Sequence, residues 1–169
     1  TASLIRRRAA IDPEWDPITL ISDLLSAVTL STTEPTVRES VLTDLAAAMY
    51  FADRPEEVDR LRGLIAGIDE YNRILLGVAE AMTADGRDQA ARAAMEAMSD
   101  VPEPAAPDST PSLLRVVRVW RDLGEFDRAV ATAEGLERYD AAAFLVTLPA
   151  DYIPNPIAAA AVERMVRRV

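Results

Sequence analysis

Apolar residues recur at helical spacing along almost the whole chain, and this pattern constrains the fold more than any other feature. The first set falls at i, i+3, i+6, i+7 and i+10, which is one helix face: Ile18, Ile21, Leu24, Leu25 and Val28. Thirty of the 169 residues are Ala and nine are aromatic, a composition that favours helix over strand. We predict an all-α fold of about nine helices with no strand.

Prolines and glycines mark the expected helix ends. Several helices should begin at a capping residue followed by a first-turn proline, at Pro17, Pro35, Pro55, Pro111 and Pro156. The helix at Pro55 is expected to bury an apolar face of Val58, Leu61, Ile65 and Ile68.

Two further helices should start without a proline, one near Tyr71 and one capped by Asp140. Gly86 and Gly124 lie where a helix should end in the left-handed conformation or turn into the next helix.

The chain matches itself when it is shifted by 68 residues. The matches are Asp59-Arg60 with Asp127-Arg128, Gly67 with Gly135, Tyr71 with Tyr139, and Ala90-Ala91 with Ala158-Ala159. Because 68 is twice 34 and each half divides into two helix pairs, we predict a single helical-repeat domain over residues 1–169. Its expected parts are an extra helix (1–33), a first repeat pair (34–100), a Pro-rich loop (101–111) and a second repeat pair (112–169).

Two turn motifs resemble the junction between helices in tetratricopeptide (TPR)-like proteins. They are Gly86-Arg87-Asp88-Gln89-Ala90-Ala91 and Gly124-Glu125-Phe126-Asp127-Arg128-Ala129, and both are similar to that family's Gly-x-x-x-x-Ala pattern. The resemblance spans roughly residues 34–169. It implies a right-handed α-solenoid of antiparallel helix pairs, in which the first helix of each pair lines a concave face. A compact bundle of duplicated helical hairpins is the alternative fold.

The charge distribution argues against nucleic acid as a partner. The net charge is −10, with Arg6 to Arg8 near one end and Arg167 and Arg168 near the other, so residues 9–166 carry −15. A surface that negative repels phosphate. No apolar run is long enough to span a membrane and no secretory signal pattern is present, so we expect a cytoplasmic protein with no membrane partner.

The residue inventory excludes much enzyme chemistry. The chain has no His, no Cys and no Lys, so the commonest general base, thiolate nucleophiles and Schiff-base formation are missing. The many carboxylates form no compact motif, and pairs such as Glu56-Glu57 suit helix N-termini. We therefore expect no enzyme, no cofactor and no metal site.

The most suggestive polar feature is a stripe of arginines, Arg115, Arg118 and Arg121, spaced i, i+3 and i+6 on one expected helix. The TPR resemblance implies that Arg115 and Arg118, with Asn72 and Arg73 of an earlier helix, line the concave face and contact a carboxylate or an acidic peptide. The alternative is that they are surface arginines paired with acids such as Asp122, Glu125 and Glu137.

The expected function is that of a protein–protein interaction module. It would act as an adaptor, a chaperone-like holder or an assembly subunit that binds a peptide or helix of another protein on its repeat surface. One alternative is an acidic inhibitor that mimics nucleic acid and blocks a basic partner, and another is an all-helical small-molecule-binding or enzyme domain. The last helix, Ala158 to Val169, is expected to join two copies of the chain.

Overall fold

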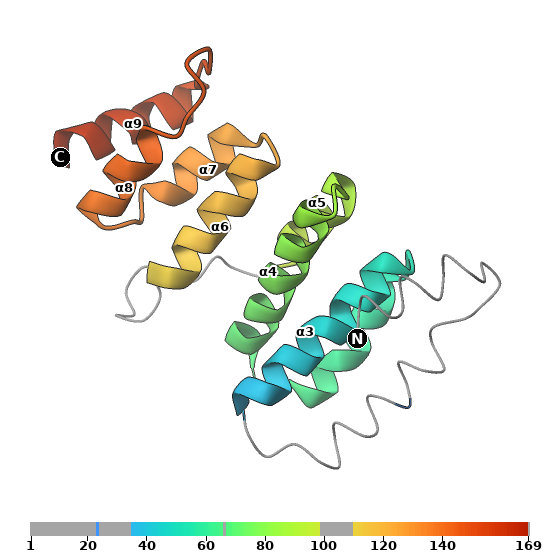
Figure 1. The fold of residues 1–169 in the computed structure, drawn as a ribbon. Coiled ribbons are helices and arrows are strands. Elements are labelled where there is room, and N and C mark those ends of the chain that lie inside the picture. Colours follow the sequence, from blue (N-terminus) through green and yellow to red (C-terminus); the bar gives the residue numbers. More distant parts are fainter. Residues whose placement is uncertain (1–22, 24–34, 66, 99–109, 169) are drawn as a thin grey trace. The chain divides into compact units, whose positions relative to one another are not determined.

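The structure is a computed structural model that describes residues 23, 35–65, 67–98 and 110–168. This part of the chain contains seven α-helices, one 3₁₀ helix and no strand (Figure 1), which confirms the all-α prediction for the described residues. The helix expected from Pro17 and the Pro-rich loop lie outside them, apart from Asp23 and the loop's last two residues.

The chain divides into two compact units, residues 1–99 and 100–169. The described part of the first unit consists of α3 (Pro35–Phe51), η1 (Pro55–Leu64), α4 (Ile68–Ala84) and α5 (Asp88–Ala97). Helix α3 packs against η1 and α4, and α4 packs against α5. Eight of the 17 residues of α4 are buried because the helix has a neighbour on two sides. Its first turn carries Asp69 and Glu70, whose charges favour the positive end of the helix dipole.

Three helix ends share one turn geometry, at Asp53, Gly86 and Gly124. Each of these residues has a positive φ, of 56°, 73° and 75° respectively. The next residue donates its N–H to the carbonyl five positions back, as Arg87 does to Met82 at 2.9 Å. This hydrogen bond, repeated from Arg54 and from Glu125, is the signature of a Schellman motif. The predicted turns at Gly86 and Gly124 are confirmed, and Asp53 forms a third.

The helix expected at Pro55 differs from the prediction. Residues 55–64 form a 3₁₀ helix, and Ile68 begins α4 rather than continuing the same face. Val58 and Leu61 are both buried, and their separation of three residues matches the three-residue turn of a 3₁₀ helix. Two buried residues at this spacing fit the tighter helix, and Ile68 is half exposed.

Helices α3 and α4 run parallel, in a register of about 34 residues. Arg38 of α3 forms an ion pair with Glu70 of α4, with Nη2 3.2 Å from Oε2. One turn further on, Arg73 of α4 pairs with Glu39. Later still, a Cβ at Gly77 would lie 2.6 Å from Cγ2 of Thr43. Gly77 therefore lies where α3 and α4 approach closely, and a Cβ there would collide with Thr43 unless that side chain moved.

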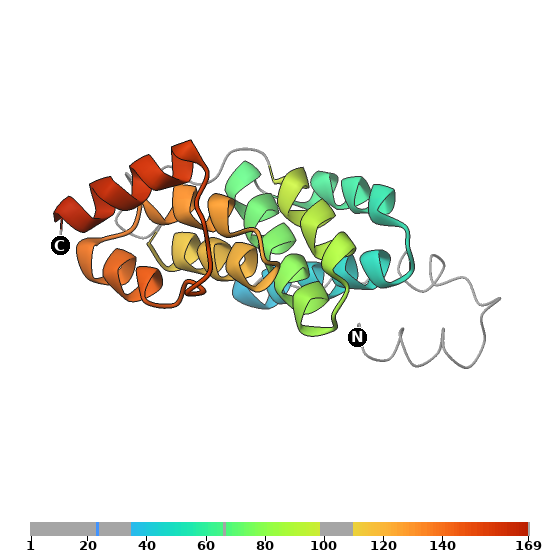
Figure 2. The ribbon, with the colours of Figure 1, turned by 90° about the horizontal axis from the view of Figure 1, so that it is seen from above.

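The described part of the second unit consists of α6 (Thr110–Asp122), α7 (Phe126–Ala133), α8 (Arg138–Leu145) and α9 (Pro156–Arg168). Helix α6 packs on α7, and α7, α8 and α9 contact one another. Figure 2 shows α8 (orange) and α9 (dark red) joined by a long loop. The predicted cap of α9 is confirmed, because Oδ1 of Asn155 accepts the N–H groups of Ile157 and Ala158 at 3.0 and 2.9 Å.

The cap predicted for α8 is wrong. Asp140 was expected to precede the helix, but α8 begins at Arg138 with Glu137 at the N-cap position. Asp140 instead lies in the first turn, where a negative charge is also favourable.

Helices α7 and α9 also run parallel. At the start of both helices, Asp127 Oδ1 accepts the N–H of Asn155 at 3.1 Å. At the far end of α7, Glu134 forms a two-pronged ion pair with Arg164 and accepts a hydrogen bond from Arg168 through its carbonyl oxygen. The described helices include none that is long and apolar enough to cross a membrane.

Candidate functional site

Asn72 and Arg73 are neighbours on α4 but have different environments. Asn72 is 4% exposed and lies inside the first unit. Arg73 is exposed, and its Nε donates to Oε2 of Glu39 at 3.0 Å. Of the two residues predicted to bind a partner here, the structure therefore presents Arg73 at the surface and places Asn72 in the core. The Glu39 pairing agrees with the alternative that Arg73 is a surface arginine held by an acid.

Arg115, Arg118 and Arg121 all lie on the one face of α6 that is not buried. The opposite face is fully covered and consists of Leu113, Val116, Val117, Val119 and Trp120. At 100° per residue, the three arginines span an arc of about 120° centred on Arg118. The three arginines therefore share one side of α6, the first helix of the α6–α7 hairpin, and Leu114 and Asp122 lie between them on the helical wheel.

The three arginines differ in how they are held. Arg121 is tied to Asp122, with Nη2 2.7 Å from Oδ1. Arg115 is half-buried and has interactions of its own. Arg118 is exposed and forms no ion pair within the part of the chain that the structure describes. Arg118 is thus the member of the stripe best placed to meet an external anion.

The five predicted site residues fall in two groups. Asn72 and Arg73 belong to the first unit, whereas the α6 stripe belongs to the second. Within each unit the members share one helix, α4 for Asn72 and Arg73 and α6 for the three arginines.

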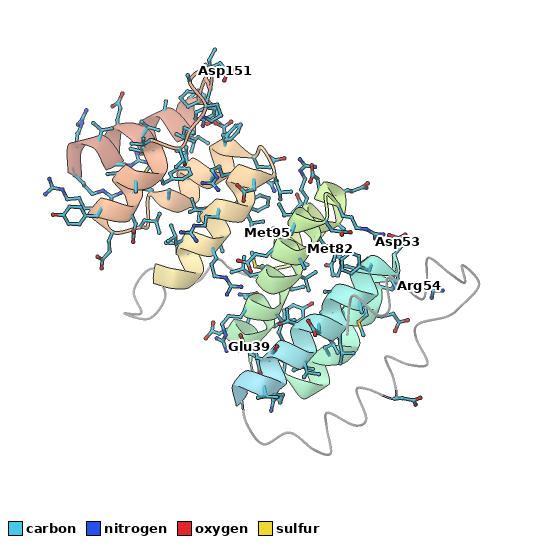
Figure 3. All side chains as sticks on the ribbon, viewed as in Figure 1. Glu39, Asp53, Arg54, Met82, Met95 and Asp151 are labelled. Atoms are coloured by element: carbon cyan, nitrogen blue, oxygen red, sulfur yellow. The ribbon has the colours of Figure 1, made fainter. Side chains whose placement is uncertain are left out.

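A cleft in the first unit was not foreseen. It has a volume of about 790 Å³ and is lined by Tyr50, the turn after α3 and the first turns of α5. Figure 3 labels Asp53 and Arg54 at that turn. The one signal in the sequence was the spacing of 33 residues between Asp53 and Gly86, which places two equivalent turns at the same end of neighbouring hairpins.

Arg87 connects the two sides of this cleft. Its Nη1 donates to the carbonyl oxygen of Phe51 at 3.2 Å, and its guanidinium lies 5.1 Å from the centre of the Phe51 ring. The Arg87 guanidinium also forms two longer ion pairs, at 3.8 Å with the carboxylate of Asp53 and at 3.7 Å with that of Asp85. Arg87 therefore acts as a brace between the end of α3 and the start of α5.

Tyr50 forms the inner wall of the cleft and is 5% exposed. Burial, with smaller contributions from the charges of Tyr71 and Asp59, raises the pKa of Tyr50 to about 12. Tyr71 donates its hydroxyl to Asp59 Oδ1 at 3.4 Å. A phenol in this environment stays neutral at physiological pH.

The second unit has a polar node at Asp127 that the sequence did not reveal. Its Oδ1 accepts the hydroxyl of Tyr152 at 2.6 Å as well as the N–H of Asn155. The hydrogen bond from Tyr152 is the main reason that the pKa of Asp127 is lowered. Burial and the same hydrogen bond raise the pKa of Tyr152. The node fastens the α8–α9 loop to the start of α7.

The tyrosines matched by the 68-residue shift do not share an environment. Tyr71 is buried on α4, whereas Tyr139 is 83% exposed on α8. Asp127 matches Asp59, which accepts the hydroxyl of Tyr71. Asp127 instead accepts the hydroxyl of Tyr152, which lies in the α8–α9 loop. Helix α8 has only eight residues and buries Ala141 and Phe144, so Tyr139 faces the other way.

Comparison of the chain with models of protein families, with curated proteins and with solved structures finds no match.

Proposed function

We propose that the chain is a TPR-like helical-repeat module, a right-handed α-solenoid that binds an acidic segment of another protein on the arginine face of α6. The observation that carries the proposal is the concentration of Arg115, Arg118 and Arg121 on the unburied side of the first helix of a hairpin. Guanidinium groups bind carboxylates through paired, charge-assisted hydrogen bonds.

The repeat architecture has independent support. Parallel packing of α3 on α4 in a register of about 34 residues is what stacked hairpins of that repeat length require. Three Schellman turns at equivalent places, after α3, α4 and α6, connect one helix to the next. Helix α6 is the first helix of its hairpin and contributes positive charge to a chain whose net charge is −10.

The acidic remainder of the chain contributes selectivity. A uniformly acidic ligand is repelled by the net charge of −10 unless its carboxylates reach the α6 face, so the preferred ligand combines a few carboxylates with apolar residues. Such a ligand is a short helix or peptide with an acidic edge, which fits the role of an adaptor or assembly subunit.

Reversal of one charge tests the proposal. The probe is a labelled peptide that alternates Glu with Leu, followed by fluorescence anisotropy at low and at physiological salt. Arg118→Glu should weaken binding by about tenfold or more, because one charge-assisted hydrogen bond contributes about 1.5–3 kcal/mol. Arg54→Glu makes the same change in charge at an exposed position in the turn after α3 and should leave binding almost unchanged. Equal affinities for the wild type and Arg118→Glu would refute the α6 site.

A further inference from the structure

The cleft between the turn after α3 and the start of α5 has the size of a small-molecule site. Its volume of about 790 Å³ lies in the range of about 300–1,000 Å³ that is usual for ligand pockets. All the residues that line it belong to the first unit. A ligand in this cleft is therefore independent of the peptide proposed to bind α6, which belongs to the second unit.

The first turn of α5 brings unused hydrogen-bond donors to this cleft. Asp88, Gln89 and Ala90 line it, and their N–H groups precede the first hydrogen bond of the helix, from the N–H of Ala91 to the carbonyl of Arg87 at 3.0 Å. Arg87, at the N-cap position, provides no side-chain cap. The three N–H groups thus have no partner among the described residues, and they form the positive end of the helix dipole.

Tyr50 is a second polar group that the fold leaves unused in the same cleft. It lines the cleft and is only 5% exposed, yet its hydroxyl forms no hydrogen bond with any residue that the structure describes. A buried hydroxyl without a partner costs free energy, so a ligand that supplies the partner gains by binding here. Burial raises the pKa of Tyr50 to about 12, and the phenol is therefore an uncharged donor at neutral pH.

The charges that line the cleft favour a ligand with a single negative charge. Arg87 and Arg92 balance Asp53 and Asp88, so the lining is neutral as a whole. A dianion such as a phosphate monoester would meet the two carboxylates, both of which are exposed. A carboxylate has half that charge and accepts hydrogen bonds from the N–H groups of a helix start equally well.

We propose that this cleft binds a small organic monocarboxylate. The carboxylate accepts hydrogen bonds from the N–H groups at the start of α5, and the body of the ligand packs against the apolar part of the lining, Pro55, Ala90 and Ala93. Tyr50 donates its hydroxyl to a second oxygen of the ligand.

The test is a titration of the full chain with 4-hydroxybenzoate, which offers a carboxylate to α5 and a hydroxyl to Tyr50. Proton–nitrogen correlation spectra should show the amide protons of Asp88, Gln89 and Ala90 moving downfield, because they gain a charged acceptor. The neutral analogue 4-hydroxybenzamide should leave these resonances in place. No shift with 4-hydroxybenzoate at millimolar concentrations, or an equal shift with the amide, would overturn the proposal.

Tyr50→Phe removes only the unused hydroxyl, so the fold should persist and the affinity for 4-hydroxybenzoate should fall about threefold to tenfold. The matched control is Tyr71→Phe, which removes a hydroxyl that is bonded to Asp59 and belongs to a residue outside the cleft lining. It should leave the affinity unchanged. Equal affinities for the wild type and Tyr50→Phe would contradict the proposed binding mode.

A second pair of variants tests the place of binding. Ala93→Trp fills the cleft from an exposed position of α5 and should abolish the shifts. Ala97→Trp, one turn further along the same helix and outside the lining, should bind as the wild type does. Binding that survives in a folded Ala93→Trp, or that is lost in Ala97→Trp, would overturn the assignment to this cleft.

The kind of anion is tested with 4-hydroxyphenyl phosphate, which is mostly a dianion at neutral pH. It should bind more weakly than 4-hydroxybenzoate because of Asp53 and Asp88. Tighter binding of the phosphate would overturn the choice of a carboxylate.

Discussion

Arg73 of α4 and Glu39 of α3 form an ion pair across 34 positions of sequence, with Nε 3.0 Å from Oε2. Both side chains are partly exposed, so the pair stabilises the fold by less than about 1 kcal/mol. Its importance is geometric. Gly77 and Thr43, also 34 positions apart, touch one turn further along the same two helices. Two contacts at one spacing mean that the helices run in the same direction and in register.

Gly77→Ala should destabilise the first unit even though Ala is the better helix former. The gain in helix propensity is about 1 kcal/mol, but the new Cβ would lie 2.6 Å from Cγ2 of Thr43. Thr43 is held by its hydroxyl, which donates to the Glu39 carbonyl at 2.9 Å, so it does not turn aside freely. Overpacking of this kind costs about 1–3 kcal/mol, and urea unfolding should show a net loss of about 1 kcal/mol.

A double-mutant cycle with Thr43→Ser tests this explanation, because that variant removes the obstructing methyl group and keeps the hydroxyl. In that background Gly77→Ala should become neutral or stabilising, by up to about 1 kcal/mol. The same loss in both backgrounds would show that the two residues do not touch.

Tyr152→Phe should weaken the second unit by about 1–2 kcal/mol at neutral pH, because it removes a hydrogen bond to the charged Asp127. The hydrogen bond lowers the folded-state pKa of Asp127, so its stabilising effect is complete above the unfolded pKa of about 3.9 and is lost as the pH falls below it. The difference in unfolding free energy between wild type and variant should therefore be constant from pH 5 to 7 and shrink toward pH 2.

Tyr139→Phe serves as the control for Tyr152→Phe, because Tyr139 is 83% exposed and its change should leave the stability of the second unit unaltered. A difference between wild type and Tyr152→Phe that stays the same down to pH 2 would contradict the role of Asp127.

Asp53→Gly should stabilise the protein. Asp53 has a φ of 56°, a conformation that costs an L-residue roughly 1 kcal/mol and costs Gly almost nothing. Its ion pair with Arg87 is long, at 3.8 Å, and its side chain is 92% exposed, so its loss removes little. Thermal unfolding should show a higher Tm for Asp53→Gly and a lower Tm for Gly86→Ala. A lower Tm for Asp53→Gly would mean that the turn after α3 is not left-handed.

The Tyr50 phenol should make the first unit sensitive to alkali. Its pKa is raised to about 12 in the folded chain, against about 10 when unfolded. Between these values the unfolded state has lost a proton that the folded state keeps, so stability falls as the pH rises through this range. Tyr50→Phe should flatten the decline in unfolding free energy between pH 9 and 11. An equally steep decline in the variant would assign the effect to other groups.

Helix ends with local chemical signals could be predicted from the sequence. Asn155 before Pro156 offers a side-chain cap and a preset φ, and α9 begins there with the expected hydrogen bonds. A glycine has no Cβ, so a positive φ carries no steric penalty for Gly86 and Gly124, and both residues have a positive φ. These signals act within a few residues, so their effect does not depend on how the helices pack.

Features that depend on contacts between helices could not be predicted. Asp53 adopts the left-handed conformation without being Gly. Residues 55–64 form a 3₁₀ helix, although the i, i+3 spacing of the buried Val58 and Leu61 suits an α-helix equally well. Tyr71 and Tyr139 match in sequence and differ in burial, because that depends on which side each helix turns to its neighbours. For the candidate site, the spacing of Arg115 and Arg118 predicted a shared face, but nothing local showed that Asn72 lies in the core.

The parallel packing of α3 and α4 underlies the helical-repeat proposal, and nuclear Overhauser spectroscopy of the full chain tests it most directly. The close approach of Cγ2 of Thr43 to Gly77 predicts a strong cross-peak between the Thr43 methyl protons and the Gly77 α-protons. A second cross-peak, between side-chain protons of Glu39 and Arg73, fixes the direction, because antiparallel helices that cross at Gly77 would keep the first contact and lose the second. A spectrum in which both resonances are assigned and no such cross-peak appears would contradict the stacked arrangement.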